Sequence, residues 1–393
     1  MYTIRRATPK DWQEIEEVNL SNFGIKESDY LWKFHKEVTT EKRFVLAISD
    51  KTNQIIGTAA FFPSTINIGG KLLACAAVTE VGVIATHRRI GILRALLDEI
   101  FNDDEFKNAP LSSLTATQAT IYPRFGYGPA AFTEAYHLDL TKTQLNINPA
   151  TAKDIEYVDP KKSLNKLIEI YDKWHEQTPG TNDRSRARWE YELFGNNEIK
   201  PDGLQVLLHE DGYAIFNYVD GGKGIKLHEV ISTTIEAEQA LWKVICAHDI
   251  AKKLTVLSYP NMPLKFMLND IRALKTTEKY DAFWLRINDI VTVLSTLETT
   301  GEGQVTLAVT DPYQDTKTVY EFSYANGKSK CIEVMDNKAD IELNKTTLAS
   351  IVTGAITATE HYIAGNITGS ETAARKLSAA IVTAVAPRIG TYF

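Results

Sequence analysis

The sequence predicts an α+β protein in which two related domains are followed by a different one, and three observations support this fold class. The chain has 393 residues, 44% hydrophobic and 24% charged, which is enough material for several packed cores. At two places, around Val78–Ile100 and Lys226–Lys252, a predicted strand is followed by apolar residues at helical spacing. From Asn288 onward, strands separated by a tight turn precede two helical patterns. We therefore expect a repeated α+β sheet and then a separate α/β domain.

Composition and charge exclude several classes of partner. The net charge of −7 argues against a nucleic-acid partner and favours cationic substrates. The first ten residues lack the apolar run of a signal peptide, and runs such as Leu72–Val78 are too short to span a bilayer. Cys75, Cys246 and Cys331 are scattered without metal-ligand spacing. We expect reduced thiols in a cytoplasmic protein that uses no metal and binds no membrane.

The first domain is expected to form a sheet with one parallel crossover. Thr8-Pro9 begins a predicted helix, and Tyr30–Val38 is predicted to form a second one. Strands are predicted on either side of the turn at Asp50–Asn53 and on either side of a long helix from Gly91 to about Phe106. These four strands are Phe44–Ser49, Ile55–Phe62, Lys71–Ile84 and Leu111–Thr117.

A basic turn joins the third of these strands to the long helix. It reads Arg88-Arg89-Ile90-Gly91 and leads directly into the apolar helical repeat. The start of a helix offers unpaired N–H groups and the positive end of the helix dipole. Gly91 would let this backbone approach a ligand closely, and two arginines add positive charge. The turn is therefore predicted to hold a pyrophosphate, the alternative being a solvated basic turn before an ordinary helix.

The string V-x-V-x-x-T-H-R-R-x-G-x-L-R at residues 81–94 resembles the acetyl-CoA motif of the GNAT N-acetyltransferases. In detail it is similar to that of the enhanced intracellular survival (Eis) family. The resemblance implies a GNAT fold for the first domain and acetyl-CoA as cosubstrate. It also implies contacts with acetyl-CoA from a run of residues around the turn, namely Val81, Val83, Arg88, Arg89, Ile90, Gly91, Ile92, Leu93 and Arg94.

A second motif follows the last strand of the first domain. Residues 117–130 read T-Q-A-T-I-Y-P-R-F-G-Y-G-P-A, and Eis-like proteins carry a very similar I-Y-x-R-F-G-Y-G-P string. In that family the first tyrosine is the proposed general acid, which implies this role for Tyr122. A phenol within hydrogen-bond reach could protonate the departing thiolate; the alternative is an interfacial aromatic whose hydroxyl finds any partner. Tyr127 is interpreted as structural, and the resemblance places Thr117 and Gln118 against the pantetheine arm.

Glu80 lies beside Val81 on the strand that enters the basic turn. This position directs it towards the splayed strands where an acceptor amine would lie. Many GNAT enzymes use a strand glutamate as base, directly or through water, whereas the best-known Eis members have an aromatic residue there. Glu80 is therefore either a base or cation anchor, or a surface or salt-bridged carboxylate.

The chain ends in Thr391-Tyr392-Phe393. Eis-like enzymes end in an aromatic residue whose α-carboxylate enters the active site as the proposed base, which implies this role for Phe393. Burial of one phenylalanine is worth roughly 1.5–3 kcal/mol, and burial would also raise the pKa of an α-carboxyl from its ordinary value of about 3.5. The alternative is a frayed terminus.

The chain departs from the relatives that acetylate aminoglycosides. Those relatives have an acid at the penultimate position and another two places past their equivalent of Phe23, where this chain has Tyr392 and Ile25. The acids available to compensate are Glu27, Asp29 and Glu80.

The middle of the chain repeats the order of the first domain without its chemistry. A linker is predicted at Thr141–Lys162. It is followed by a helix with one apolar face, three strands, a second helix and a last strand. These elements are Leu164–Trp174, Gln205–His209, Tyr213–Val219, Lys226–Ile231, Ile235–Lys252 and Leu254–Ser258. The turn before this helix, Ser232–Glu238, lacks glycine and arginine and holds two acids that would repel phosphate. We expect a second GNAT-like domain that does not bind CoA.

The last part of the chain resembles the sterol-carrier-like third domain of the Eis family. Strands are predicted near Gln304–Thr310, Thr318–Tyr324 and Lys330–Met335, with a turn at Asn326-Gly327 and helices near Thr346–Thr353 and Ser370–Val385. A lipid tunnel and a scaffold that delivers the C-terminus are the two interpretations. The apolar residues show core periodicity without an excess, which favours the scaffold.

These expectations combine into one functional hypothesis. The domains are 1–148, 149–287 and 288–393, and the activity is transfer of acetyl from acetyl-CoA to an amine by direct attack in a ternary complex. Tyr122 is the acid, and the Phe393 carboxylate is the base, with Glu80 as second candidate. The acceptor is a polyamine, an aminoglycoside-like cation, or a lysine or N-terminal amine, and the resemblance implies a hexamer. The rival is a lipid carrier or scaffold with a vestigial CoA site.

Overall fold

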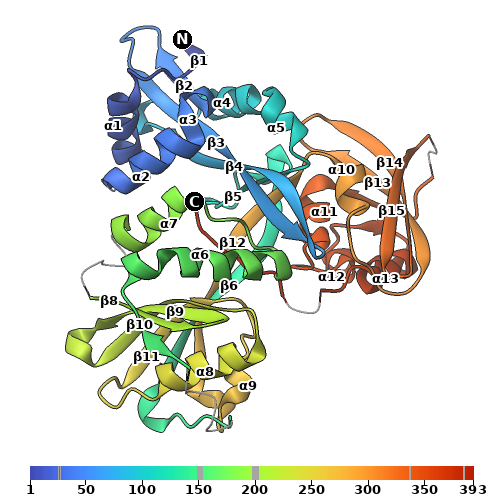
Figure 1. Ribbon diagram of the computed structural model, residues 1–393. Coiled ribbons are helices and arrows are strands. Elements are labelled where there is room, and N and C mark those ends of the chain that lie inside the picture. Colours follow the sequence, from blue (N-terminus) through green and yellow to red (C-terminus); the bar gives the residue numbers. More distant parts are fainter. Residues whose placement is uncertain (25, 27, 148–153, 197–202, 336–337, 384–385) are drawn as a thin grey trace. The chain divides into compact units, whose positions relative to one another are not determined.

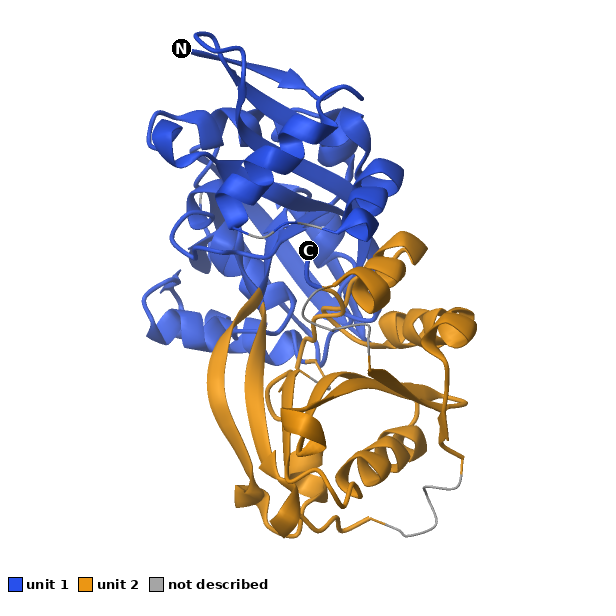
Figure 2. Ribbon diagram, turned by 90° about the vertical axis from the view of Figure 1, so that its left-hand side faces the viewer, with its two compact units in different colours: residues 1–130, 283–382, 392–393 blue, residues 131–282, 383–391 orange. Residues whose placement is uncertain are grey.

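The computed structural model describes the whole chain except residues 25, 27, 148–153, 197–202, 336–337 and 384–385. The chain divides into two compact units (Figure 2). Unit 1 comprises residues 1–130, 283–382 and 392–393, and unit 2 comprises residues 131–282 and 383–391. The predicted boundary between residues 148 and 149 lies outside the described residues.

The first sheet of unit 1 has the order β1-β2-β3-β4-β5 followed by the end of β12. Its strands are β1 (Tyr2–Arg6), β2 (Phe44–Ser49), β3 (Ile55–Ile68), β4 (Lys71–Val83), β5 (Leu111–Leu114) and β12 (Leu274–Ile287). Only β4 and β5 pair in parallel, and α4 (Ile92–Phe101) lies between them in the chain. The predicted parallel crossover is therefore confirmed, whereas β1 and β12 were not predicted.

The helices of unit 1 differ from the prediction where polar residues interrupt the apolar pattern. The predicted helix Tyr30–Val38 divides into α2 (Asp29–Phe34) and a π-helical turn, η1 (His35–Thr39). The predicted helix from Gly91 to Phe106 is two helices, because the Asp103 side chain accepts backbone N–H groups and so begins a new one. The remaining elements of this part are α1 (Trp12–Phe23), α3 (Thr40–Arg43), α5 (Asp104–Asn108), η2 (Ala85–His87) and η3 (Pro123–Phe125).

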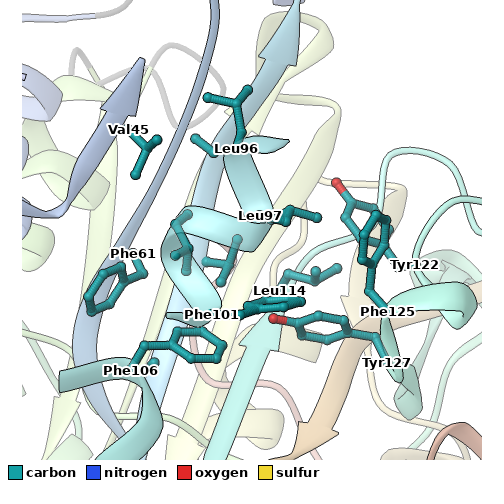
Figure 3. Close-up of a cluster of buried hydrophobic side chains, with 14 of the residues drawn as sticks. Val45, Phe61, Leu96, Leu97, Phe101, Phe106, Leu114, Tyr122, Phe125 and Tyr127 are labelled. Atoms are coloured by element: carbon teal, nitrogen blue, oxygen red, sulfur yellow. The ribbon is translucent and has the colours of Figure 1, made fainter. Parts of the chain in front are cut away.

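Helix α4 packs on β2 and β3 (Figure 1). Figure 3 shows the resulting cluster, in which Leu96, Leu97 and Phe101 of the helix meet Val45 and Phe61 of the strands. These side chains are almost fully buried. Each large apolar side chain buried in this way contributes about 1.5–3 kcal/mol. The start of α4, which carries the predicted basic turn, is therefore held rigidly against the sheet.

Unit 2 contains a sheet with the same arrangement of strands as the first sheet of unit 1. From the corresponding edge its order is β7-β8-β9-β10-β11-β6. Its strands are β6 (Gly128–Asp139), β7 (Glu156–Tyr157), β8 (Leu204–His209), β9 (Gly212–Val219), β10 (Gly224–Ser232) and β11 (Lys253–Ser258). β10 and β11 are parallel and are connected through α8 (Ile235–Cys246), so the predicted repeat of the crossover is confirmed. The helix ends at Cys246 rather than at Lys252.

The predicted linker Thr141–Lys162 was too long. α6 (Pro160–Gln177) begins inside it, with Pro160 as its first residue and the Asp159 side chain as its cap. Residues 148–153 of this linker lie outside the described part. The other helical elements of unit 2 are η4 (Leu140–Lys142), α7 (Arg186–Glu190), η6 (Tyr191–Gly195), η7 (Asp220–Gly222), α9 (Leu264–Met267) and η8 (Ile271–Ala273).

The last part of the chain adds a second sheet to unit 1, with the order β15-β14-β13-β16-β17. Its elements are α10 (Ile290–Leu294), β13 (Gly303–Asp311), β14 (Thr316–Ala325), β15 (Lys328–Val334), β16 (Ile341–Asn344), α11 (Lys345–Val352), α12 (Ala358–Ile363), β17 (Thr368–Gly369) and α13 (Glu371–Ala380). The three predicted strands are confirmed. The predicted turn at Asn326-Gly327 is confirmed as well, and both of its residues have positive φ. The last helix ends at Ala380, and residues 384–385 of its predicted range lie outside the described part.

Within unit 1 the turn between β13 and β14 contacts the crossover helix α4. The Tyr313 hydroxyl donates to Asp98 of α4 at 2.6 Å, and its ring packs edge-on against Phe101 at 5.0 Å between centroids. Arg286 of β12 donates to the Phe125 carbonyl at 2.6 Å. These contacts suit the predicted scaffold.

Among the described residues, no helix combines the length and the hydropathy needed to cross a bilayer.

Candidate active site

Strand β4 separates from β5 as it approaches the basic turn. Its ladder with β5 covers only Cys75–Ala77, whereas its ladder with β3 continues to Val83. In the described part of the chain no strand pairs with β4 on the β5 side from Val78 onward. The main chain at Val81 and Val83 therefore borders an open edge, as a ligand that adds main-chain hydrogen bonds would require. One of the carbonyls is used, because Arg88 Nε donates to the Val83 oxygen at 2.9 Å.

The turn at the start of α4 has the geometry of an anion cradle. Arg89 has φ 66° and Gly91, the N-cap residue of the helix, has φ 91°, so two residues of the turn are left-handed. No side chain caps this helix start, and its first turn contains no acid. Arg88, Arg89, Ile90 and Gly91 are exposed. The first N–H groups of α4 thus remain available to an anion, with positive charge nearby.

The other residues predicted to contact CoA divide between core and surface. Ile92 is buried, so its side chain belongs to the hydrophobic cluster, and Leu93 packs partly against the same cluster. Arg94 is exposed and lies over the Tyr313 ring, 5.5 Å from its centroid. Thr117 and Gln118 are exposed in the turn after β5, which ends at Leu114 rather than at the predicted Thr117.

The corresponding turn of unit 2 begins a helix that has a side-chain cap and acidic residues in its first turn. The Thr234 side chain caps α8 by accepting from the Ala237 N–H at 3.3 Å. Glu236 and Glu238 lie in the first turn, and Glu238 accepts a short hydrogen bond from the Ser232 hydroxyl. An occupied cap and two acids oppose phosphate binding. This geometry favours the expectation that unit 2 does not bind CoA.

Tyr122 lies at the edge of the hydrophobic cluster of unit 1 (Figure 3). The residue is 5% exposed, and burial raises the pKa of its phenol to about 12. Its carbonyl accepts the N–H groups of Phe125 and Tyr127 at 2.9 and 3.3 Å, which fixes the backbone of the turn. Its hydroxyl makes no hydrogen bond to any residue that the structure describes. Tyr122 therefore has a proton to donate, and none of the described residues accepts it.

Tyr127 is engaged differently. Its fully buried hydroxyl lies 2.7 Å from Ser112 Oγ, which lies 2.7 Å from the Ala76 carbonyl. Because Ser112 gives its only proton to that carbonyl, Tyr127 donates to Ser112. Burial raises the pKa of Tyr127 as well. This chain of hydrogen bonds ties the turn to β4 and β5, in agreement with the structural interpretation of Tyr127.

Glu80 is an internal, paired carboxylate rather than a surface one. Its side chain is 10% exposed; one oxygen accepts a short hydrogen bond from Asn19 Nδ2 and the other lies 3.1 Å from His35 Nε2. The Thr58 hydroxyl donates to the Glu80 carbonyl at 2.8 Å. Glu80 has φ 53° and sits at a bulge in the β3–β4 ladder, so its side chain is turned out of the regular strand alternation. A backbone of this kind costs about 1–3 kcal/mol and is typical of functional sites.

Phe393 lies in unit 1 as part of a series of aromatic contacts. Its ring packs edge-on against Phe62 with 5.1 Å between centroids. Phe62 in turn meets Phe34 at 5.2 Å, and Phe34 meets His35 at 5.4 Å. The last residue is therefore packed rather than frayed, and through these rings it is linked to the imidazole that pairs with Glu80.

Sequence reasoning missed the polar partners of Glu80 and a third residue near them. Asn19 is fully buried and follows Ile15 by four residues, so a polar residue on the apolar stripe of the predicted helix was the available signal. Asn22, on the same stripe, has its amide atoms buried without a hydrogen-bond partner in the described part of the chain and lies against Gly82. His35 carried no signal beyond its place in an aromatic run.

Of the two further acids considered for acceptor binding, Asp29 and Glu27, the structure describes only Asp29. Asp29 opens α2, whereas Glu27 and the departing position Ile25 lie outside the described residues. In the described part of the chain no group of three or more His, Cys, Asp or Glu side chains could hold a metal ion.

Comparisons with known proteins agree with this architecture. Family models described as acetyltransferase (GNAT) domain match residues 3–130 and 180–287, and one described as sterol carrier protein domain matches residues 290–390. N-acetyltransferase Eis of Mycobacterium tuberculosis (strain ATCC 25177 / H37Ra) is 28% identical over 316 residues, which is 77% of either chain. An uncharacterized N-acetyltransferase of Streptomyces coelicolor, SCO2625, is 26% identical over 330 residues, 79% of either chain.

Solved structures extend the likeness to the full length. The crystal structure of Eis1 from Mycobacterium abscessus superposes with a TM-score of 0.87 at 26% identity and covers 100% of both chains. A GCN5-related N-acetyltransferase from Anabaena variabilis has a TM-score of 0.85 at 21% identity, again over 100% of both chains, and shares the fold. The chain thus consists of two GNAT domains followed by a sterol-carrier domain. It is an acyltransferase whose sequence and fold are similar to those of the Eis N-acetyltransferases.

Proposed function

We propose that the protein transfers acetyl from acetyl-CoA to an amine by direct attack in a ternary complex. The observation that carries this proposal is the uncapped, cationic start of α4 beside the open edge of β4. Arg88–Arg94 would hold the diphosphate, and the main chain at Val81 and Val83 would bind the pantetheine arm together with Thr117 and Gln118. In this proposal the CoA-binding GNAT domain comprises residues 1–148, the second GNAT-like domain residues 149–287 and the sterol-carrier-like domain residues 288–393. By resemblance, the protein is a cytoplasmic homo-oligomer, a hexamer.

The chemistry assigns one proton movement to each of two groups. The amine nitrogen attacks the thioester carbonyl, so that a C–N bond forms and the C–S bond breaks. Tyr122 donates its phenolic hydrogen towards the departing sulfur, and the Phe393 carboxylate takes the proton of the amine, with Glu80 as second candidate. A phenol of pKa about 12 is a weaker acid than a CoA-like thiol of about 8.5. We therefore assign Tyr122 chiefly to stabilising the developing thiolate, with the proton moving as the C–S bond breaks.

The acceptor is proposed to be a cation. Glu80 is a carboxylate beside the open edge of β4, and 10% of its side chain is exposed. A negative charge in this place suits the ammonium group of a polyamine, an aminoglycoside-like amine or a peptide. The direct test is acetyl-CoA-dependent release of free thiol with a panel of these three classes. Release with none of them, under conditions in which CoA binds, would contradict amine acetylation.

One CoA is expected to bind per chain, and Arg89→Gly is expected to weaken it roughly 10- to 100-fold, the value of one charge-assisted hydrogen bond. Glycine suits the positive φ of this position, so the loss would come from the guanidinium rather than from backbone strain. Titration calorimetry measures both quantities. Arg375→Ala, at an exposed arginine of α13, serves as the matched control. Two sites per chain would contradict the assignment of unit 2 as silent.

Glu80→Gln is expected to raise the KM for a cationic acceptor about 10-fold or more, with CoA affinity unchanged. The amide keeps the shape of the side chain but removes the charge that would attract the ammonium group. Steady-state kinetics against acceptor concentration give the measurement, and Glu99→Gln, at a partly exposed acid of α4, is the control. An unchanged KM combined with a lower melting temperature would make the His35 pairing purely structural.

A further inference from the structure

The end of the chain is bound by side chains of unit 2 through a pattern of paired hydrogen bonds. The Thr391 N–H donates to Asn182 Oδ1 at 2.9 Å, and Asn182 Nδ2 donates back to the Thr391 carbonyl at 3.3 Å. Arg184 Nε donates to Thr391 Oγ1 at 2.6 Å, and one terminal nitrogen of the same guanidinium donates to the Gly390 carbonyl at 2.7 Å. Both the backbone and the side chain of Thr391 are thus recognised.

Arg184 is itself held in place by a buried set of partners. Its side chain is 5% exposed and forms a bidentate pair with Glu229, with both N···O distances 3.0 Å. The guanidinium carbon lies 4.3 Å from the ring centroids of both Tyr171 and Trp189. The Tyr213 hydroxyl donates to Glu229 at 3.0 Å. A buried cation needs such pairing. The planar guanidinium binds the Glu229 carboxylate bidentately and the Gly390 carbonyl at once, a geometry that an ammonium group lacks.

The fit leaves no room for a side chain at two glycines. A Cβ on Gly390 would lie 2.1 Å from the Tyr171 hydroxyl, and one on Gly180 would lie 2.8 Å from the Arg388 carbonyl. The Arg388 N–H donates to the Pro179 carbonyl at 2.9 Å, which adds a backbone contact further up the segment. Residues 387–391 therefore meet a surface shaped to them, and we call Tyr171, Asn182 and Arg184 the tail seat.

We propose that the second GNAT-like domain serves as the receptor for the C-terminal segment of its own chain, with Arg184 as a positioning residue. In part this inference rests on the proposed function, because it makes the seat the anchor of the Phe393 carboxylate. Two residues span at most about 7 Å of extended chain, so fixing Thr391 restricts the volume that the carboxylate can explore. This gives a role to a GNAT-like domain whose own anion turn is capped and acidic.

The test uses two single variants of the full chain, Thr391→Val and Arg184→Lys, and both are expected to loosen the C-terminal segment. Valine keeps the shape of threonine but leaves Arg184 Nε without its acceptor, so amide hydrogen exchange in residues 390–393 is expected to accelerate roughly 10- to 100-fold. Turnover is expected to fall by a similar factor, with CoA affinity unchanged. Arg186→Lys, at an exposed arginine that pairs with Glu190, should change none of these readouts. Melting temperatures of all variants report whether the fold is retained.

A size-matched pair provides a second measurement. Gly390→Ala should release the segment. Adding Tyr171→Phe, which removes the clashing hydroxyl together with its 2.8 Å hydrogen bond to the Asn182 carbonyl, should restore part of the exchange protection and turnover. Unchanged exchange in Thr391→Val and in Gly390→Ala would overturn the tail seat. Faster exchange with unchanged turnover would support the seat and would instead overturn the Phe393 carboxylate as the base.

Discussion

Tyr122→Phe is expected to lower turnover roughly 100-fold or more while leaving CoA affinity unchanged. The ring belongs to the hydrophobic cluster of unit 1, and phenylalanine preserves that packing. The hydroxyl makes no hydrogen bond in the described part of the chain, so its removal should not lower the melting temperature. Thiol-release kinetics and CoA calorimetry on the same preparation separate the two effects. Full turnover in this variant would remove Tyr122 from the mechanism.

Tyr127→Phe is the matched control. It removes the hydrogen bond to Ser112, which should cost about 1 kcal/mol of stability, yet turnover should stay within a few-fold of the unmodified protein. The pH dependence gives a further check. Since burial raises the pKa of Tyr122 to about 12, the phenol remains protonated and competent as a donor up to pH 10 and loses its proton only as the pH approaches 12. Loss of turnover near pH 9 that disappears in Tyr122→Phe would contradict this.

One glycine added after Phe393 is expected to reduce turnover roughly 10- to 100-fold, the range of a lost general base. The addition converts the α-carboxylate of Phe393 into a peptide group and moves the new carboxylate by about 3.3–3.6 Å. The ring contact with Phe62 and the hydrogen bonds to Thr391 need not change. Steady-state turnover and CoA affinity of the extended protein are the measurements.

Phe393→Leu is the control for this extension, because it keeps an α-carboxylate and an apolar side chain. It is expected to retain turnover within about 10-fold, since it loses mainly the edge-on contact with Phe62. An extended protein that turns over normally would exclude the terminal carboxylate and leave Glu80 as the base. The extension and the tail-seat variants are complementary, because the first alters the carboxylate and the second alters only what holds it.

Much of the fold could be predicted from the sequence because the signals are local. The change from strand to helical period around Gly91, and its recurrence around Ile235, led to both parallel crossovers. Two left-handed residues mark the Asn326-Gly327 turn, and such turns are encoded by adjacent residues. The errors fall where a single polar side chain decides a boundary, as at Asp103, whose cap divides one predicted helix into two.

The sequence by itself determined the order of the domains, the basic turn before α4 and the tyrosine motif, because each depends on neighbouring residues. Only the tertiary structure decided which polar side chains meet. Glu80 pairs with Asn19 and His35, and Thr391 binds Arg184, across wide separations in the chain. No periodicity encodes such pairs, since they form only after the apolar faces of distant segments have packed. Burial then makes unpaired polar groups costly, and the pairing specific.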